Sequence, residues 1–242
     1  MTPQELMDAT APKVGALGGS FYFAPATLAV GKEHGLDGMR FYILGRGGVL
    51  GDVAPAVVTS AFGYFHPAAI AKLWDSAKEI VAPRTAADLY NECCADFGRQ
   101  KLADVDGLAE FCDAAETLVA ACPLGALSLY AGWTAQPLAD DLPARAMQLI
   151  ALLREQRGSA HLAAIVASGL RPEVAHAMKR PDMVSTFGWD PAPAFDDSHS
   201  ALASRAEALT DDALRDIFGV LSDAQAAAYL AGVDAAAAAA AA

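Results

Sequence analysis

The sequence predicts an all-α fold, a multi-helix antiparallel bundle with a small C-terminal helical module. Three observations support this prediction. Apolar residues recur at three- and four-residue steps wherever the chain is not rich in glycine. Proline or a capping residue stands at the start of several of these stretches, as in the first turn of a helix. Short loops join the stretches, which suits antiparallel neighbours.

In chain order, the apolar periodicity predicts a series of helices. They cover residues 25–34, 54–63, 67–79, 85–101, 104–120, 141–155, 159–168, 197–208 and 211–219. Asp104 suits an N-cap, and Gly169 suits the end of the 159–168 helix. Ser222 and Gln225 form a capping-box pattern before a last helix, which the eight final alanines are able to continue.

Two short apolar runs, residues 21–23 and 41–44, are open to a second interpretation as strands. No third run offers a partner, and two lone strands make a marginal sheet, so helix is expected for both. Farther along, prolines surround residues 186–189 and predict an irregular connector. The expected organisation is a helical main domain over 1–180, a connector over 181–197 and the C-terminal helical module over 198–242.

The composition disfavours several classes of protein. No stretch approaches the roughly 18 consecutive apolar residues of a membrane span. The beginning lacks the pattern of a secretory signal, so a cytoplasmic protein is expected. The net charge is −12, and the segment from Asp182 to Asp223 contains nine acidic residues but only two arginines. Repulsion from the phosphates makes DNA a disfavoured partner. The four cysteines form no CxxC pair and are expected to be buried and reduced.

Residues 45–51 (GRGGVLG) form the one glycine-rich segment that resembles a phosphate-binding loop. Its spacing fits neither a dinucleotide fingerprint, which needs glycine where Leu50 stands, nor a P-loop. A tight turn capped by Asp52 is expected instead, with Arg46 directed either at a carboxylate inside the protein or at an anionic ligand. In the following segment Pro67 suits the start of a helix, so His66 is expected to cap that helix.

The segment 154–161 holds the most suggestive side chains. If the helix continues through Gly158, then Arg154, Arg157 and His161 lie within about 60° of one another around its axis. Two cations and an imidazole on one face suit a carboxylate or a phosphate.

The alternative is that internal acids satisfy these arginines and that His161 is an interhelical hydrogen-bonding residue. The acids considered for this role are Asp88, Glu92 and Asp96. No metal site is expected, because Ile165 stands where a second histidine would be needed and His176 lies too far along the chain.

Nine of the 19 aromatic residues fall within the first 75 positions, among them Tyr22 and Tyr64. They either form the N-terminal core or surround a flat apolar ligand. No serine or cysteine nucleophile motif is present, so no catalytic residue is indicated and the cofactor is unknown.

Several segments carry a family resemblance. These segments are FYILGRGGVLGDV (41–53), AFGYFHP (61–67), AGW (131–133) with Pro137, LLREQRGSAHLAA (152–164) and FGW (187–189). Together they resemble a family of actinobacterial helical proteins that carries the label helix-turn-helix. The resemblance implies an all-helical body with a C-terminal module of the winged-helix type. Here the residues after 189 are proline-rich and acidic, so the wing of that module is expected to be missing.

The leading functional hypothesis is a small-molecule-binding protein, or ligand-responsive regulator, that takes a partly apolar anion. Its expected ligand-binding residues are Arg46, Arg154, Arg157, His161, Tyr22, Tyr64 and His66. Two alternatives belong to other classes: a helix-turn-helix regulator that binds DNA, and an enzyme that uses His161 as acid or base. A homodimer is compatible with each of them, and no membrane partner is expected.

Overall fold

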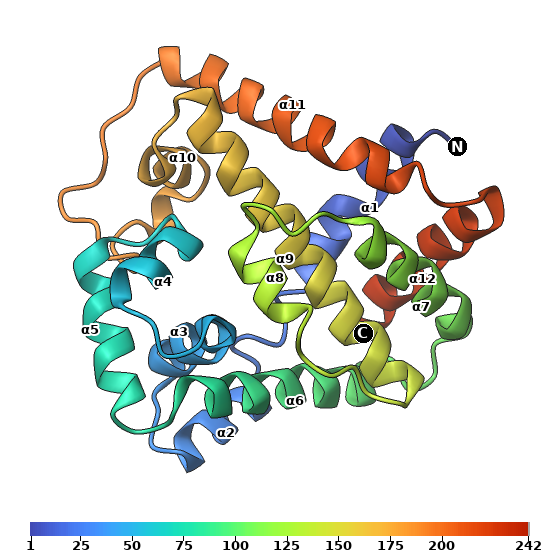
Figure 1. Cartoon of the computed structure of the whole chain (residues 1–242), viewed down its shortest axis with the longest axis horizontal. Coiled ribbons are helices and arrows are strands. Elements are labelled where there is room, and N and C mark those ends of the chain that lie inside the picture. The colour runs from blue at the N-terminus through green and yellow to red at the C-terminus, as the bar shows by residue number, and fades with distance from the viewer. Residues whose placement is uncertain (242) are drawn as a thin grey trace.

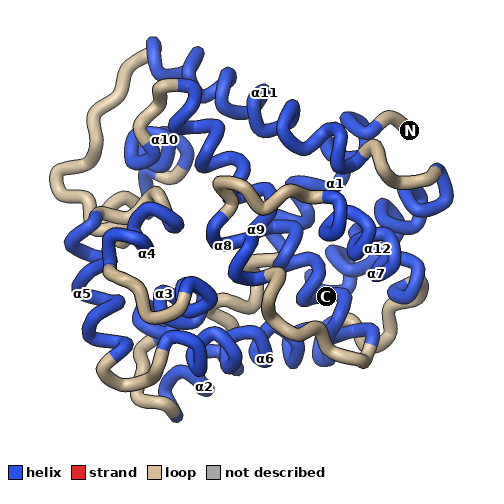
Figure 2. Tube along the Cα trace, in the orientation of Figure 1, coloured by secondary structure: helices blue, strands red, loops and turns tan. Residues whose placement is uncertain are grey.

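The computed structural model describes residues 1–241. Within this range the regular structure is helical, as Figure 2 shows, and the prediction of an all-α fold is confirmed. The α-helices are Pro3–Leu17 (α1), Pro25–Glu33 (α2), Gly38–Gly47 (α3), Pro55–Phe62 (α4), Pro67–Lys78 (α5), Pro83–Lys101 (α6), Leu108–Ala121 (α7), Ser128–Trp133 (α8), Leu142–Ser168 (α9), Pro172–Lys179 (α10), Ser198–Phe218 (α11) and Asp223–Ala241 (α12).

Helix α9 crosses the middle of the molecule, and the other helices are arranged around it (Figure 1). It contacts α1, α6, α7, α8, α10 and α11. Asp141 caps its first turn by accepting a hydrogen bond from the backbone N–H of Ala144, and Gly169 ends it in the left-handed conformation with φ of 87°. One long helix therefore presents side chains to most of the fold.

The continuity of α9 differs from the prediction of separate helices over 141–155 and 159–168. Gly158 lies inside the helix, and a Cβ added there would meet no atom within 4 Å. Glycine costs about 1 kcal/mol relative to alanine in a helix interior, which packing along the rest of α9 outweighs. The predicted helices 197–208 and 211–219 are likewise joined, in α11.

The expected glycine loop over 45–51 is wrong, because the first three of these residues are the last turn of α3 and Gly48–Leu50 is a 3-10 helix. The glycines serve close packing against α6. A Cβ at Gly45 would lie 2.7 Å from the ring of Tyr90, and one at Gly48 would collide with the carbonyl oxygen of Pro83. Asp52 makes no capping hydrogen bond to this segment among residues 1–241; its side chain pairs with Lys78 at 3.1 Å.

Other boundaries also differ. Residues 41–44 are helical as expected, whereas 21–23 form turns between α1 and α2. Helix α7 begins at Leu108, after Gly107, so Asp104 is not its N-cap. Helix α1 was not expected, although Thr2 and Glu5 form a capping box at its start. The capping pair of Ser222 and Gln225 at the start of α12 is confirmed.

The core extends from the N-terminal to the C-terminal helices. Phe21, Phe41 and Trp74 are buried in it, and so are Phe218 of α11 and Tyr229 of α12. The four cysteines are free and buried, as expected. The division of the chain into 1–180, 181–197 and 198–242 stays a prediction.

The membrane criteria give a mixed result for residues 1–241. No single helix is both long and apolar enough to cross a membrane. One bent pair, Gly38–Leu50 with Pro55–Phe62, meets the criteria of length and composition.

Candidate ligand-binding site

A cavity of about 290 Å³ lies between α1, α3, α4, α9 and α10, and we refer to it as the arginine cavity. Arg46, Arg154 and Arg157 line it, and no carboxylate does so among the described residues. Its aromatic lining consists of Tyr42, Phe62, Tyr64, Phe65, His176 and Phe187. Cations and aromatic faces thus border the same space.

Glu155, on α9, pairs with both Arg46 and Arg154. Its carboxylate accepts hydrogen bonds from Arg46 Nε and Nη2, both at 2.8 Å, and from Arg154 Nη1 at 3.1 Å. A fourth comes from the hydroxyl of Tyr22 at 2.7 Å. Burial opposes the charge of Glu155 most strongly, but the two guanidiniums and these hydrogen bonds outweigh it and lower its pKa to about 2.

The aromatic rings hold the same two guanidiniums in place. Arg46 donates to the hydroxyl of Tyr42 at 3.1 Å and lies 4.6 Å from the ring centroid of Phe62. Arg154 donates to the hydroxyl of Tyr22 at 2.8 Å and lies 4.8 Å from the centroid of its ring. Two buried or half-buried cations share one buried carboxylate, so this cluster carries one positive charge in excess.

Arg157, one turn farther along α9, reaches α11. Its Nη2 donates to Glu207 at 2.9 Å and lies 3.9 Å from a carboxylate oxygen of Asp211. The internal acids that pair with the site arginines are therefore Glu155, Glu207 and Asp211. Glu155 is next to Arg154 in the sequence, whereas Glu207 lies 50 positions from Arg157 and has no local signal that points to this pairing.

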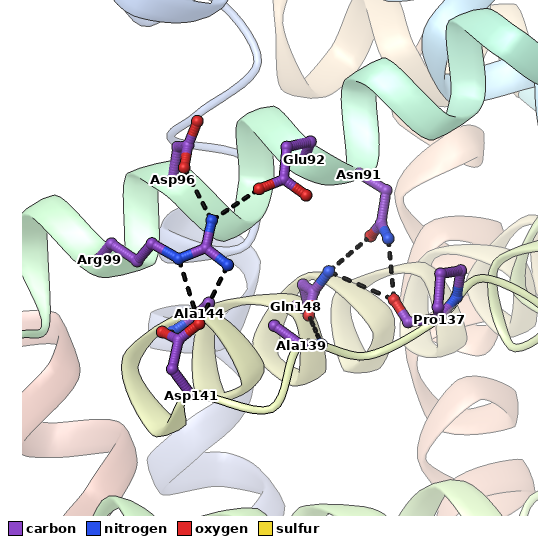
Figure 3. A network of polar contacts seen from close by, with 9 residues as sticks. All are labelled: Asn91, Glu92, Asp96, Arg99, Pro137, Ala139, Asp141, Ala144 and Gln148. Atoms are coloured by element: carbon purple, nitrogen blue, oxygen red, sulfur yellow. Dashed lines mark hydrogen bonds and ion pairs between the residues drawn. The ribbon is translucent and has the colours of Figure 1, made fainter.

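The acids considered from the sequence, Glu92 and Asp96, have another partner. Both accept hydrogen bonds from Arg99, at 2.6 and 2.8 Å, and Arg99 also pairs with Asp141 at 3.0 Å (Figure 3). Asp88 makes no ion pair with the described residues. In the same view, the side chains of Asn91 and Gln148 bond to each other and to the 137–139 backbone. The expectation for these three acids was wrong, because all three lie on α6 and Glu92 and Asp96 are held there by Arg99 of the same helix.

His161 does not line the arginine cavity. It borders a separate cavity of about 280 Å³ between α9, α10 and α11, together with Lys179 and Glu207. The hydroxyl of Thr210 donates to the Ala206 carbonyl, so its oxygen is left to accept from His161 Nδ1 at 2.9 Å. Burial lowers the pKa of His161, and the nearby charge of Glu207 opposes this. His161 is thus an interhelical hydrogen-bonding residue, as the alternative interpretation held.

His66 and Tyr22 are placed near the arginine cavity without lining it. The Nδ1 of His66 accepts a hydrogen bond from the backbone N–H of Ala68 at 3.2 Å, which confirms its capping role at α5. Tyr22 acts through Glu155 and Arg154, as described above. Of the seven expected residues, Arg46, Arg154, Arg157 and Tyr64 are brought together at the cavity.

The connector contributes a side chain that the sequence did not single out for the site. Phe187 stacks on Phe65 and on His176, each with ring centroids 3.9 Å apart. Trp189 donates from Nε1 to the Tyr64 carbonyl at 2.8 Å, and the backbone N–H of His66 donates to the Phe187 carbonyl at 2.8 Å. The Phe187-Gly188-Trp189 segment was the available signal, but its long-range partners were not readable from the sequence.

His176 adds a polar atom to this aromatic wall. Its Nε2 is buried and has no hydrogen-bond partner among the described residues, although buried polar atoms are normally paired. Burial and the charge of Arg180 lower the pKa of His176, which favours the neutral imidazole. Over residues 1–241 no group of three or more His, Cys, Asp or Glu side chains is placed to hold a metal ion.

Comparison with known proteins gives one match. A family model described as a helix-turn-helix family matches residues 8–242. No curated protein and no solved structure matches the chain.

Proposed function

Because that match extends over residues 8–242, the chain belongs to this helix-turn-helix family, and within it we propose a protein that binds a small, partly aromatic organic anion in the arginine cavity. The observation that carries the proposal is the unbalanced charge at this cavity. Arg46 and Arg154 share the single carboxylate of Glu155, which lies behind them, and no acid among residues 1–241 lines the space. An anion placed there would compensate the excess positive charge where water screens it least.

The shape and lining of the cavity support an aromatic or otherwise flat ligand. Its volume of about 290 Å³ is just below the usual range for small-molecule sites, about 300–1,000 Å³, so a small ligand fits it best. Tyr64 and Phe65 contribute aromatic surface to the lining, and Arg157 of α9 contributes a guanidinium. Guanidinium groups bind carboxylates in a planar, bidentate manner that a lysine cannot reproduce.

Titration calorimetry with 2-naphthoate tests this function. The purified protein is expected to bind one equivalent, and Arg157→Gln is expected to weaken binding by tenfold or more, since a hydrogen bond to a charged group contributes about 1.5–3 kcal/mol. Arg157 is preferred to Arg46 because its surface pairs with α11 stabilise the fold less than the buried pair of Arg46 does.

The matched control is Arg205→Gln, which removes the same charge from an exposed position of α11 without an ion pair. Its affinity for 2-naphthoate should equal that of the unaltered protein. Binding that is absent from the unaltered protein, or equally weakened in both variants, contradicts the proposal.

DNA binding is the second candidate, and the family description is the observation in its favour. The distribution of charge opposes it. Twelve of the 17 lysines and arginines lie within 4 Å of a carboxylate. The others are Lys32, Lys72, Arg84, Lys101 and Arg205, which are spread over α2, α5, α6 and α11. Helix α11 itself is acidic, whereas a helix that enters the major groove needs cations for the phosphates.

An electrophoretic shift assay with random-sequence duplex DNA at low salt separates the two candidates. The ligand-binding proposal expects no retardation at micromolar protein, with or without 2-naphthoate. A shift that weakens steeply with salt would favour DNA binding instead. The cytoplasmic location and a homodimeric state stay predictions.

A further inference from the structure

A second cavity, of about 210 Å³, lies next to the arginine cavity between α1, α9, α11 and α12. Its walls are mainly apolar, so we refer to it as the apolar cavity. Met7, Leu153, Leu214 and Phe218 are buried side chains that line it. Surface of this kind binds hydrocarbon because contact removes apolar area from water.

Three residues line both cavities and stand between them. Ala11 and Val14 of α1 and Arg157 of α9 line both of them. The side chain of Arg157 is held at this junction by Glu207 and Asp211 of α11. An anionic group bound beside Arg157 in the arginine cavity would therefore lie next to the apolar cavity, with these three side chains between the two spaces.

The charges on the two sides differ. The arginine cavity has three arginines and no acid in its described lining, whereas Asp8 and Asp211 line the apolar cavity. Asp8 is exposed, and its only described side-chain partner is the amide of Gln4. A negative charge on the part of a ligand that enters the apolar cavity would thus meet like charge, while an uncharged segment would not.

We propose that the ligand is an amphipathic monoanion, with its carboxylate at the arginines and an uncharged hydrocarbon tail that passes Arg157 into the apolar cavity. This inference rests on the proposed function, since it assigns the class of ligand that the same site binds. The arginine cavity alone would accept a short aryl acid, and the apolar cavity adds a preference for length.

A series of ω-phenylalkanoates tests the inference on the unaltered protein by titration calorimetry. Phenylacetate, 4-phenylbutanoate, 6-phenylhexanoate and 8-phenyloctanoate carry the same head and progressively longer tails. Each methylene that enters an apolar site contributes about 0.8 kcal/mol, so affinity should rise about fourfold per added carbon until the cavity is filled. Octanedioate should bind at least tenfold more weakly than octanoate.

Two variants test whether the hydrocarbon tail occupies the apolar cavity. Leu214→Phe narrows the apolar cavity and is expected to remove the gain with tail length while phenylacetate binding is retained. Ile217→Phe is the matched control, because Ile217 lies on the same helix and lines a different cavity. It should preserve the gain, and circular dichroism checks that both variants are folded.

The outcomes separate the two proposals. If phenylacetate binds but the longer acids gain nothing, the inference is overturned and the proposed function stands. If none of the acids binds, both fail. A gain that Leu214→Phe leaves intact, or octanedioate binding that equals that of octanoate, also overturns the inference.

Discussion

Arg46 of α3 and Glu155 of α9 form a bidentate ion pair, with both nitrogen–oxygen distances at 2.8 Å. The side chains are 12% and 4% exposed, so the pair lies in a region of low dielectric. It joins α3 to α9 through two residues that are 109 positions apart in the chain. The same carboxylate also receives Arg154 and Tyr22, which makes Glu155 the residue on which the geometry of the arginine cavity depends.

Replacing Glu155 by glutamine should destabilise the protein strongly. The amide keeps the shape but leaves Arg46 and Arg154 without a compensating charge, and breaking a buried pair from one side costs about 3–5 kcal/mol. Urea unfolding, followed by circular dichroism, measures this as a lower midpoint.

Glu92→Gln provides the comparison. Glu92 pairs with Arg99 at an exposed site where Asp96 and Asp141 remain as partners, so its loss should cost less than about 1 kcal/mol. Equal losses in the two variants would show that burial of the Arg46 pair contributes nothing to stability.

Stability should depend on Glu155 in acid. Its pKa is about 2 in the folded protein against an ordinary value of 4.5, so the folded state binds the proton less readily than the unfolded chain. The contribution of Glu155, about 3 kcal/mol, is complete above pH 5 and is lost as the pH falls from 4.5 toward 2.

Urea midpoints measured between pH 7 and pH 3 test this dependence. The fall should be shallower in Glu155→Gln, because that variant has no carboxyl group to protonate at this position. A variant that loses stability as steeply as the unaltered protein would assign the acid sensitivity to other carboxylates.

Two substitutions of Gly158 should change helix stability and ligand binding independently of each other. A Cβ at Gly158 meets no atom within 4 Å, so Gly158→Ala should stabilise α9 by about 0.5–1 kcal/mol. Gly158→Leu should keep the helical gain but extend its side chain into the arginine cavity, which Gly158 lines.

Thermal unfolding and 2-naphthoate titration, applied to both variants, measure the two effects. Gly158→Ala is expected to bind nearly normally, and Gly158→Leu at least tenfold more weakly with an undiminished melting temperature. If Gly158→Leu binds normally, the ligand lies elsewhere.

The connector should be held to the main body by the indole of Trp189. Trp189→Phe removes the hydrogen bond to the Tyr64 carbonyl and keeps the aromatic body, at a cost of about 1 kcal/mol. Amide hydrogen exchange of the segment around Phe187, followed by mass spectrometry, should become faster, while exchange in α6 stays unchanged. Unchanged exchange at Phe187 would mean that its stacking on Phe65 and His176 suffices.

The sequence predictions succeed where the interacting residues are close together in the chain and fail where they are far apart. Helical periodicity, the His66 cap and the Ser222–Gln225 capping pair depend on residues two to four positions apart, and these predictions are confirmed. The glycines of 45–51 illustrate the opposite case. Their role in packing α3 on α6 depends on Tyr90 and Pro83, which are distant in the chain, so a local pattern was mistaken for a loop.

The sequence by itself determined that the chain is helical and where most helices begin, and it singled out Arg46, Arg154 and Arg157 as candidate anion-binding residues. Only the tertiary structure decided their partners, because Glu155 and Glu207 lie 109 and 50 positions from Arg46 and Arg157. It also placed His161 away from the cavity and brought Phe187 to it. Ion pairing and aromatic stacking act through space, whereas helix formation is governed by neighbours within about one turn.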